Sequence, residues 1–121
     1  MGAFGRPANR RRGEISAVID GEQRVLCLTL GALAELEAAF EAGNLAELAE
    51  RFGSGRLSAT DLIRVIGAGL RGGGNLFSDD EVAAMAIDGG AAGSARIVSD
   101  LLAAAFGASE AEPRPRTPQE A

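Results

Sequence analysis

Three polar residues, each followed three positions later by an acidic residue, divide the middle of the chain into short helices. The pairs are Asn44 with Glu47, Ser58 with Asp61 and Ser78 with Glu81. In such a capping box the polar side chain accepts a hydrogen bond from the backbone N–H of the acid, and the acid's carboxylate accepts one from the backbone of the cap residue. Each pair therefore predicts the start of a helix. The helix after Ser78 is predicted to carry Val82, Met85 and Ile87.

Two further helices are predicted on either side of these three. Thr29 is suited to cap an earlier helix, which we expect Gly43 to end in the left-handed conformation. Its apolar residues recur at helical spacing and are Leu30, Leu33, Leu36 and Phe40. After the break at Gly89-Gly90, a last helix is predicted from about Ala92 to Phe106. Its predicted apolar side consists of Ile97, Val98, Leu101, Leu102 and Phe106.

An Asp-Gly pair near the start of the chain predicts a β-hairpin. Asp20-Gly21 stands between two β-prone runs, residues 14–19 and 23–28. A two-residue type I′ turn needs positive φ at both central positions, which Asp and Gly tolerate. The alternation places Ile15, Ala17 and Ile19 on one face and Glu14, Ser16 and Val18 on the other. The sequence leaves the register of pairing open.

Together these elements predict an α+β fold that is mainly α, with an N-terminal β-hairpin followed by about five short helices. Residues 1–12 are predicted to form a flexible basic arm, because residues 1–13 carry a charge of +4. Residues 13–107 are predicted to be a single hairpin-plus-helical domain, and residues 14–107 carry −8. Residues 108–121 are predicted to be a disordered Pro-rich tail.

The missing residue types argue against an enzyme and against a cofactor or metal site. The chain has no His and no Lys, and its one cysteine is Cys27. Without His the commonest general base and metal ligand is absent, and one Cys cannot form an internal disulfide. Cys27 lies in an apolar run and is predicted to be a buried small hydrophobe. No apolar stretch reaches the ~18 residues of a membrane span, so we expect a cytoplasmic protein.

Two segments imitate ligand-binding motifs. Residues 67–72 match the letters of the dinucleotide fingerprint, but that fingerprint needs a strand before the glycines, and here a helix is predicted. Asp79, Asp80 and Glu81 resemble a cation site, but acids in the first turn of a helix are explained by capping and by the helix dipole. We therefore predict no nucleotide and no metal.

Three stretches carry a resemblance to a known family. They are residues 11–14 (RRGE), residues 28–37 (LTLGALAELE) and residues 69–74 (GLRGGG). These residues resemble the gene transfer agent family, whose members are grouped with phage tail assembly chaperones and are also described as tail tube proteins. The resemblance covers roughly residues 11–106. It implies a non-enzymatic assembly chaperone that binds the tape measure protein, or other tail proteins, during tail assembly.

The resemblance leaves two alternatives, a structural tail or tail tube component and a weak nucleic-acid-binding module using residues 10–12. The acidic body disfavours the second alternative, and a homo-oligomer is left open. The predicted partner-binding residues are Arg71, Gly72, Gly73, Gly74 and Asn75, because three consecutive glycines give a backbone freedom that a packed core does not need. The alternative is a flexible connection between helices.

Overall fold

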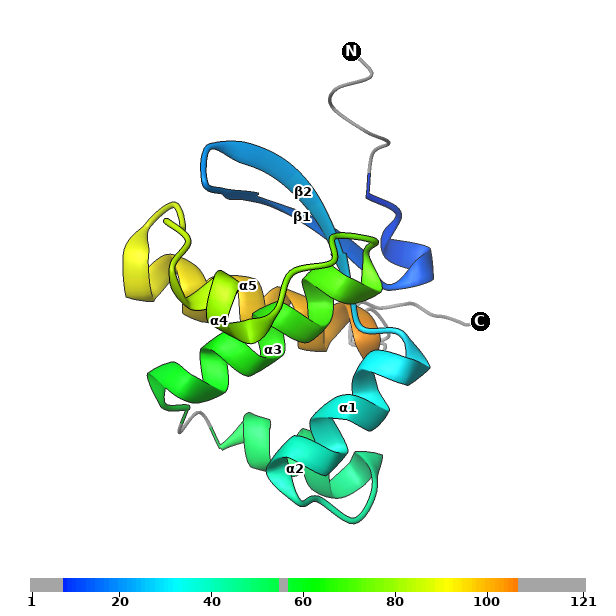
Figure 1. The fold of residues 1–121 in the computed structure, drawn as a ribbon. Coiled ribbons are helices and arrows are strands. Elements are labelled where there is room, and N and C mark those ends of the chain that lie inside the picture. The colour runs from blue at the N-terminus through cyan, green and yellow to red at the C-terminus, as the bar shows by residue number, and fades with distance from the viewer. Residues whose placement is uncertain (1–7, 55–56, 107–121) are drawn as a thin grey trace.

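The protein is an antiparallel hairpin packed against a group of helices (Figure 1). The computed structural model describes residues 8–54 and 57–106. In chain order the elements are η2 (Arg10–Arg12, a 3-10 helix), β1 (Glu14–Ile19), β2 (Glu22–Cys27), α1 (Leu30–Phe40), α2 (Leu45–Gly53), α3 (Ala59–Gly72), α4 (Asp79–Ala83) and α5 (Gly90–Ala105). The predicted fold class is confirmed. Within the described residues no helix is long and apolar enough to cross a membrane.

The hairpin turns at Asp20 and Gly21, as predicted, with φ of 56° and 78°. Its strands pair antiparallel, with Ile15 opposite Leu26 and Ala17 opposite Arg24. The turn is also held from outside, because the Asp20 N–H donates to the Ala86 carbonyl at 2.7 Å. The chain after α4 therefore lies beside the tip of the hairpin.

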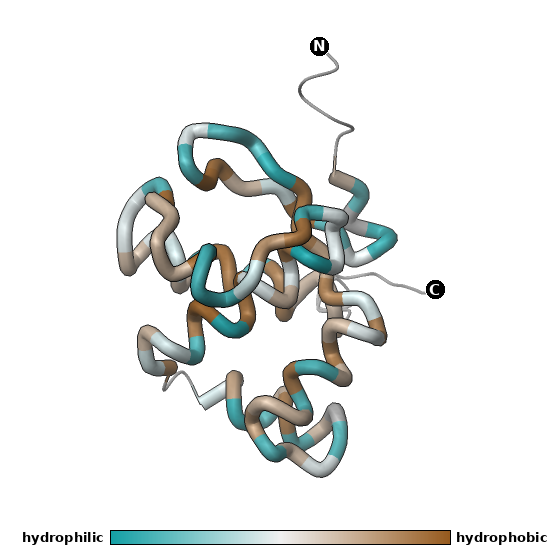
Figure 2. The backbone as a smooth tube through the Cα atoms, viewed as in Figure 1, coloured by the Kyte–Doolittle hydropathy of each residue, from teal (hydrophilic) through white to brown (hydrophobic). Residues whose placement is uncertain are grey.

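Helix α3 is the central element of the fold. It crosses the middle of the molecule and contacts β2, α1, α4 and α5 (Figure 1). The close approach of α5 depends on Gly69, because a Cβ there would lie 2.7 Å from a methyl of Leu101. Figure 2 shows hydrophobic and hydrophilic stretches alternating along the helices, as expected for helices with one buried side. The largest fully buried side chains of the described residues are Ile19, Leu26, Leu36, Leu48, Val65, Ile66, Leu70, Val98 and Leu101.

The predicted helix starts are confirmed. Thr29 caps α1. Ser58 with Asp61 and Ser78 with Glu81 form complete capping boxes. Asn44 caps α2, but the carboxylate of Glu47 accepts from the Gly43 N–H at 2.8 Å. The second hydrogen bond of this capping box therefore comes from Gly43, one residue before the cap residue Asn44.

Helix α1 begins after Thr29 as predicted, but its end and the burial of its first residue differ from the prediction. It ends at Phe40, and the residue in the left-handed conformation is Glu41, with φ of 56°, instead of Gly43. Leu30 is 79% exposed, although it belongs to the apolar stripe by spacing. As the first residue of the helix, it lies one turn before the first buried residues, Ala32 and Leu33. Leu33, Leu36 and Phe40 are buried as core.

The chain between α4 and α5 also differs from the prediction. Helix α4 ends at Ala83, so Met85 and Ile87 lie beyond it. Ile87 instead forms a β-bridge with Ile19, because the backbone here extends beside the hairpin tip. Helix α5 begins at Gly90, before the predicted Ala92.

The alternation of β1 places Glu14 on the face opposite Ile15, where its neighbour Ser16 is exposed, but the exposure of Glu14 is only 3%. The reason is the segment before it, which folds over the carboxylate and donates the Asn9 N–H to its Oε1 at 2.9 Å. Arg12 approaches the other oxygen at 3.9 Å. Residues 10–12 of the predicted flexible arm thus form the short helix η2, while residues 1–7 and the predicted tail, 108–121, lie outside the described residues.

Burial of Leu36 gives a direct test of the core. Leu36 is 1% exposed, so Leu36→Ala should lower the free energy of unfolding by about 2–5 kcal/mol through lost burial and a cavity. The matched control is Leu30→Ala on the same helix, which should change it by less than about 0.5 kcal/mol. Urea titration followed by circular dichroism measures both. Equal losses would contradict the packing described for α1.

Candidate functional site

The predicted partner-binding residues lie at the end of α3 and in the loop that follows. Gly72 and Gly73 pack directly on β2, where a Cβ would clash with the carbonyl oxygens of Cys27 and Val25. We predicted these glycines to provide backbone freedom, whereas in the structure they allow close packing on β2. Gly74 is different, because it has open space around it and a φ of 97° that favours glycine.

Asn75 fastens the loop to the hairpin. Its Nδ2 donates to the Val25 carbonyl at 2.8 Å and to the Leu70 carbonyl at 3.3 Å. Its Oδ1 accepts from Nη1 of Arg24 at 3.2 Å. One amide side chain therefore links β2, the end of α3 and the loop.

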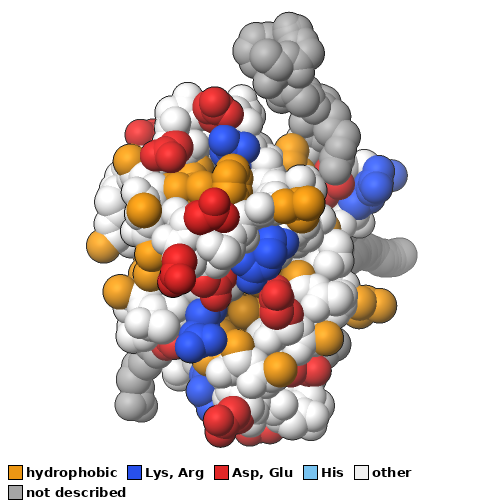
Figure 3. All heavy atoms as spheres, viewed as in Figure 1, with side chains coloured by type: hydrophobic (Ala, Val, Ile, Leu, Met, Phe, Trp, Pro, Cys, Tyr) orange, Lys and Arg blue, Asp and Glu red, His pale blue; other side chains and the backbone are white. Residues whose placement is uncertain are grey.

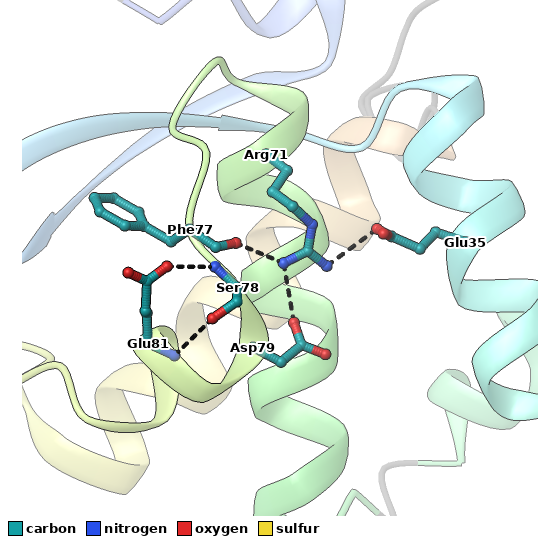
Figure 4. Close-up of polar contacts among 6 residues, drawn as sticks. All are labelled: Glu35, Arg71, Phe77, Ser78, Asp79 and Glu81. Atoms are coloured by element: carbon teal, nitrogen blue, oxygen red, sulfur yellow. Dashed lines mark hydrogen bonds and ion pairs between the residues drawn. The ribbon is translucent and has the colours of Figure 1, made fainter.

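Arg71 joins three helices (Figure 4). Its Nη2 donates to Oε1 of Glu35 on α1 at 3.1 Å, and its Nη1 donates to Oδ1 of Asp79 on α4 at 3.1 Å. Nη1 also donates to the Phe77 carbonyl at 2.7 Å. Partial burial opposes the charge of Arg71, but the hydrogen bonds and charges of Glu35 and Asp79 outweigh this effect and raise the pKa of the guanidinium. Arg71 is therefore permanently charged and oriented by its partners.

Two acids of α4, Asp79 and Glu81, make hydrogen bonds within the protein. Asp79 binds Arg71, and Glu81 caps its own helix through the Ser78 N–H at 2.8 Å, which confirms the capping interpretation (Figure 4). Within the described residues no group of three or more His, Cys, Asp or Glu residues is arranged to hold a metal ion. Figure 3 shows acidic and basic side chains interspersed on the face that carries α3 and α4. Cys27 is buried, as predicted.

A larger hollow lies elsewhere, between α2 and α5. This α2–α5 groove has a volume of about 520 Å³. Its large apolar residues are Phe52, Leu57, Val98, Leu102 and Phe106. Its small residues are Ala49, Gly53, Ala95, Ser99 and Ala103. Among the described residues that line the groove, every side chain is apolar except that of Ser99, and none is titratable.

A second hollow, of about 220 Å³, lies where the start of α5 faces α3 and α4. This α3–α5 groove is lined by Leu62, Ile63 and Ile66 of α3, by Val82 of α4 and by Ala91 of α5, among others. A third hollow, of about 240 Å³, lies between α1 and α3 and is bordered by two of the predicted residues, Arg71 and Gly72. The structure thus places two of the five predicted residues beside this third hollow, which is more polar than the other two.

The residues of α5 that line the groove were not predicted to lie at the surface. We assigned Val98, Leu102 and Phe106 to a single apolar side, but the side chains of Leu102 and Phe106 are only partly buried. A signal was present, because Ala95, Leu102 and Phe106 extend the apolar surface of α5 well beyond one stripe. Helical periodicity alone does not say which of two apolar sides is covered.

These features define a small α+β protein whose surface offers apolar grooves and a fixed arginine. Residues 12–108 match the family model described as phage tail tube protein, GTA-gp10. The chain therefore belongs to this gene transfer agent family, and it is a phage tail-related protein. Neither the curated proteins nor the solved structures contain a significant match to it.

A substitution can test whether Gly73 is needed for packing on β2 and not for backbone freedom. Gly73→Ala should lower the free energy of unfolding by about 1–3 kcal/mol, because the added methyl collides with the Val25 carbonyl. Gly53→Ala, at the end of α2 with nothing within 4 Å, is the matched control and should lose nothing or gain up to about 1 kcal/mol. Thermal unfolding of both variants measures the difference. Similar behaviour of the two would mean that the contact with β2 is not tight.

Proposed function

We propose that this protein is a non-enzymatic tail assembly chaperone that binds the tape measure protein in the cytoplasm while the tail is built. The observation that carries the proposal is the α2–α5 groove of about 520 Å³ in a chain of a phage tail family. Contiguous apolar surface of this kind on a small protein marks a site of interaction with another macromolecule.

The partner proposed is helical because of what the groove is made of. Small residues such as Ala49 and Ala95 leave room for a helix to approach, while Phe52, Leu102 and Phe106 provide apolar contact. Amphipathic helices bind in such grooves through side chains spaced three and four residues apart. A tape measure protein, as the family resemblance implies, is long and helical and exposes apolar faces that need covering before assembly.

A binding role also agrees with the state of the polar groups. The best-placed cation, Arg71, is engaged by Glu35 and Asp79 in ion pairs at 3.1 Å each. The chain contains no His to act as a general base near neutral pH. These observations support surface recognition over chemistry on a substrate.

The segment Arg71–Asn75 stays a predicted second contact. Gly74 is exposed, and Leu76, which follows Asn75, is 82% exposed. Gly72, Gly73 and Asn75 hold the loop on β2, so Leu76 is presented from a rigid base. In the proposal this loop adds contact at the edge of the complex, and the α2–α5 groove provides most of the binding.

A charge placed in the groove should break the complex. Ala95 is exposed and lines the α2–α5 groove, so Ala95→Glu buries an unpaired carboxylate when a partner helix binds. Co-expression with the tape measure protein of the same locus, followed by affinity purification, should recover the complex for wild type and at least about tenfold less for Ala95→Glu. The control is Ala38→Glu on the exposed side of α1, which should bind as wild type does. If Ala95→Glu leaves the recovery of the complex unchanged, the α2–α5 groove is not the binding site.

The second candidate function is a structural component of the tail, which the family description as a tail tube protein favours. Within the described residues the sheet has only two strands, whereas a ring closed by sheets needs more strands from each subunit. Quantitative mass spectrometry of purified particles separates the two roles. A chaperone should be depleted from particles relative to the major tail proteins, while a tube component should be present in comparable amounts.

A further inference from the structure

The outer edge of β2 is open near the tip of the hairpin. Ile19 and Glu22 pair next to the two-residue turn, so the backbone groups of Gln23 and Val25 alternate with theirs and point away from β1. The outward groups nearest the tip are the C=O of Gly21, the N–H and C=O of Gln23 and the N–H of Val25. Among the described residues none of these four groups has a hydrogen-bond partner. Gly21, Glu22 and Gln23 are exposed.

Other parts of the sheet edges are occupied by the chain itself. On β2, the Val25 carbonyl accepts from the side chain of Asn75 at 2.8 Å. On β1, the Val18 carbonyl accepts from the Asp88 N–H at 3.5 Å, and the Asn9 carbonyl accepts from the first residue of the strand at 3.1 Å. The β1 edge is therefore bordered at both ends. The open part of β2 instead runs into the turn, which lies at the periphery of the molecule (Figure 1).

We propose that two copies of this chain join through the open edge of β2, by antiparallel pairing of β2 with β2 centred on Gln23. Each copy donates the N–H groups of Gln23 and Val25 to the other copy and accepts at its own carbonyls of Gln23 and Gly21. The two hairpins then form one continuous sheet in the order β1-β2-β2-β1. The contact uses the same surface on both copies, so it closes with two of them. The proposal does not depend on the proposed function.

The charges beside the edge favour a second copy in this register. Pairing centred on Gln23 places Glu22 of each copy directly opposite Arg24 of the other, and opposite charges in that position stabilise a sheet. A shift by two residues in either direction keeps the outward groups facing one another. One such shift places Glu22 opposite Glu22, and the other places Arg24 opposite Arg24, which destabilises the pairing. The edge of β2 is thus complementary to itself when it is centred on Gln23.

The charged side chains are already placed for this contact. Glu22 and Arg24 form an ion pair within the chain at 3.0 Å, and the Glu22 side chain is 68% exposed. Asn75 accepts from Arg24 at 3.2 Å, and the guanidinium lies 5.0 Å from the centre of the Phe77 ring. Arg24 is therefore held at the edge, and pairing joins the ion pairs of both copies into a ring of alternating charges.

The dimer is expected to be weak and reversible. The paired segment is short, and each copy carries a net charge of −5, which opposes association. Interfaces smaller than the standard size are typical of transient complexes, so we expect a Kd above about 1 μM. Added salt acts in both directions, because it screens the overall repulsion and also the exposed ion pairs. Variants therefore test the contact better than salt does.

Proline substitutions in the full chain test the edge, with sedimentation equilibrium up to about 1 mM protein as the measurement. Gln23→Pro removes the central outward N–H and leaves the hydrogen bonds between β1 and β2, because proline is tolerated where a strand N–H faces outward. It should weaken the dimer at least about tenfold. Ser16→Pro makes the same change at an outward position of β1 and should dimerise as wild type does, as should Gln23→Thr. Circular dichroism checks that each variant is folded.

Two further variants test the register. Glu22→Arg places like charges opposite each other at two symmetric positions and should weaken the dimer at least about fivefold. Gln23→Cys places two thiols on Cα atoms about 5.5 Å apart in the dimer, a separation that a disulfide spans. Mild oxidation should therefore cross-link Gln23→Cys into a dimer on a non-reducing gel. Ser16→Cys and wild type, whose Cys27 is buried, should stay uncross-linked.

Several outcomes would overturn the proposal. A chain that stays monomeric up to about 1 mM does not pair through β2. A dimer that Gln23→Pro leaves intact, or that both proline variants weaken equally, is held by another surface. A dimer that Glu22→Arg strengthens has another register. If Gln23→Pro is monomeric and still recovers the tape measure protein, the dimer and the proposed function are separate properties.

Discussion

The close packing of the end of α3 on strand β2 is the contact on which the rest of the structure depends. Gly72 and Gly73 let the helix backbone reach the carbonyl oxygens of Cys27 and Val25. Asn75 then ties the loop to the same strand at 2.8 Å. A two-stranded hairpin is marginal in water by itself, so this contact, together with α5 packed on both β1 and α3, turns the hairpin into part of a core.

The helices depend on the same arrangement, because each is short. Isolated helices below about 12–15 residues are marginal in water, and α2 and α4 have nine and five residues. Their caps satisfy the first backbone N–H groups, but packing decides whether they persist. Arg71 adds to that packing by holding α1 and α4 to the end of α3. A small aromatic contact, Phe40 against Phe52 with centroids 5.2 Å apart, joins α1 to α2.

Local signals in the sequence predicted much of this fold. The Asp20-Gly21 turn and the caps at Ser58 and Ser78 act over a few residues, so they could be read from spacing. The burial of Glu14 could not, because it depends on the preceding segment folding back over the strand. The exposure of Leu30 could not be predicted either, because helical spacing alone places it with the buried Leu33 and Leu36.

The candidate site shows the same limit. The sequence singled out residues 71–75 for their glycines, but the packing of two of those glycines on β2 became visible only with the strand in place. The α2–α5 groove joins residues 49–57 with residues 95–106, and no local pattern brings those segments together. Family membership therefore indicates the setting, a phage tail, while tertiary structure indicates which surface is available there.

The central claim is that this protein acts by binding a helical partner in the α2–α5 groove. Methyl NMR with selectively labelled alanines tests it most directly, by titration with the tape measure protein or its helical fragments. The account predicts that the methyls of Ala95 and Ala103 shift on binding, while those of Ala34 and Ala38 on α1 do not. Shifts confined to α1, with Ala95 and Ala103 unchanged in a formed complex, would contradict it.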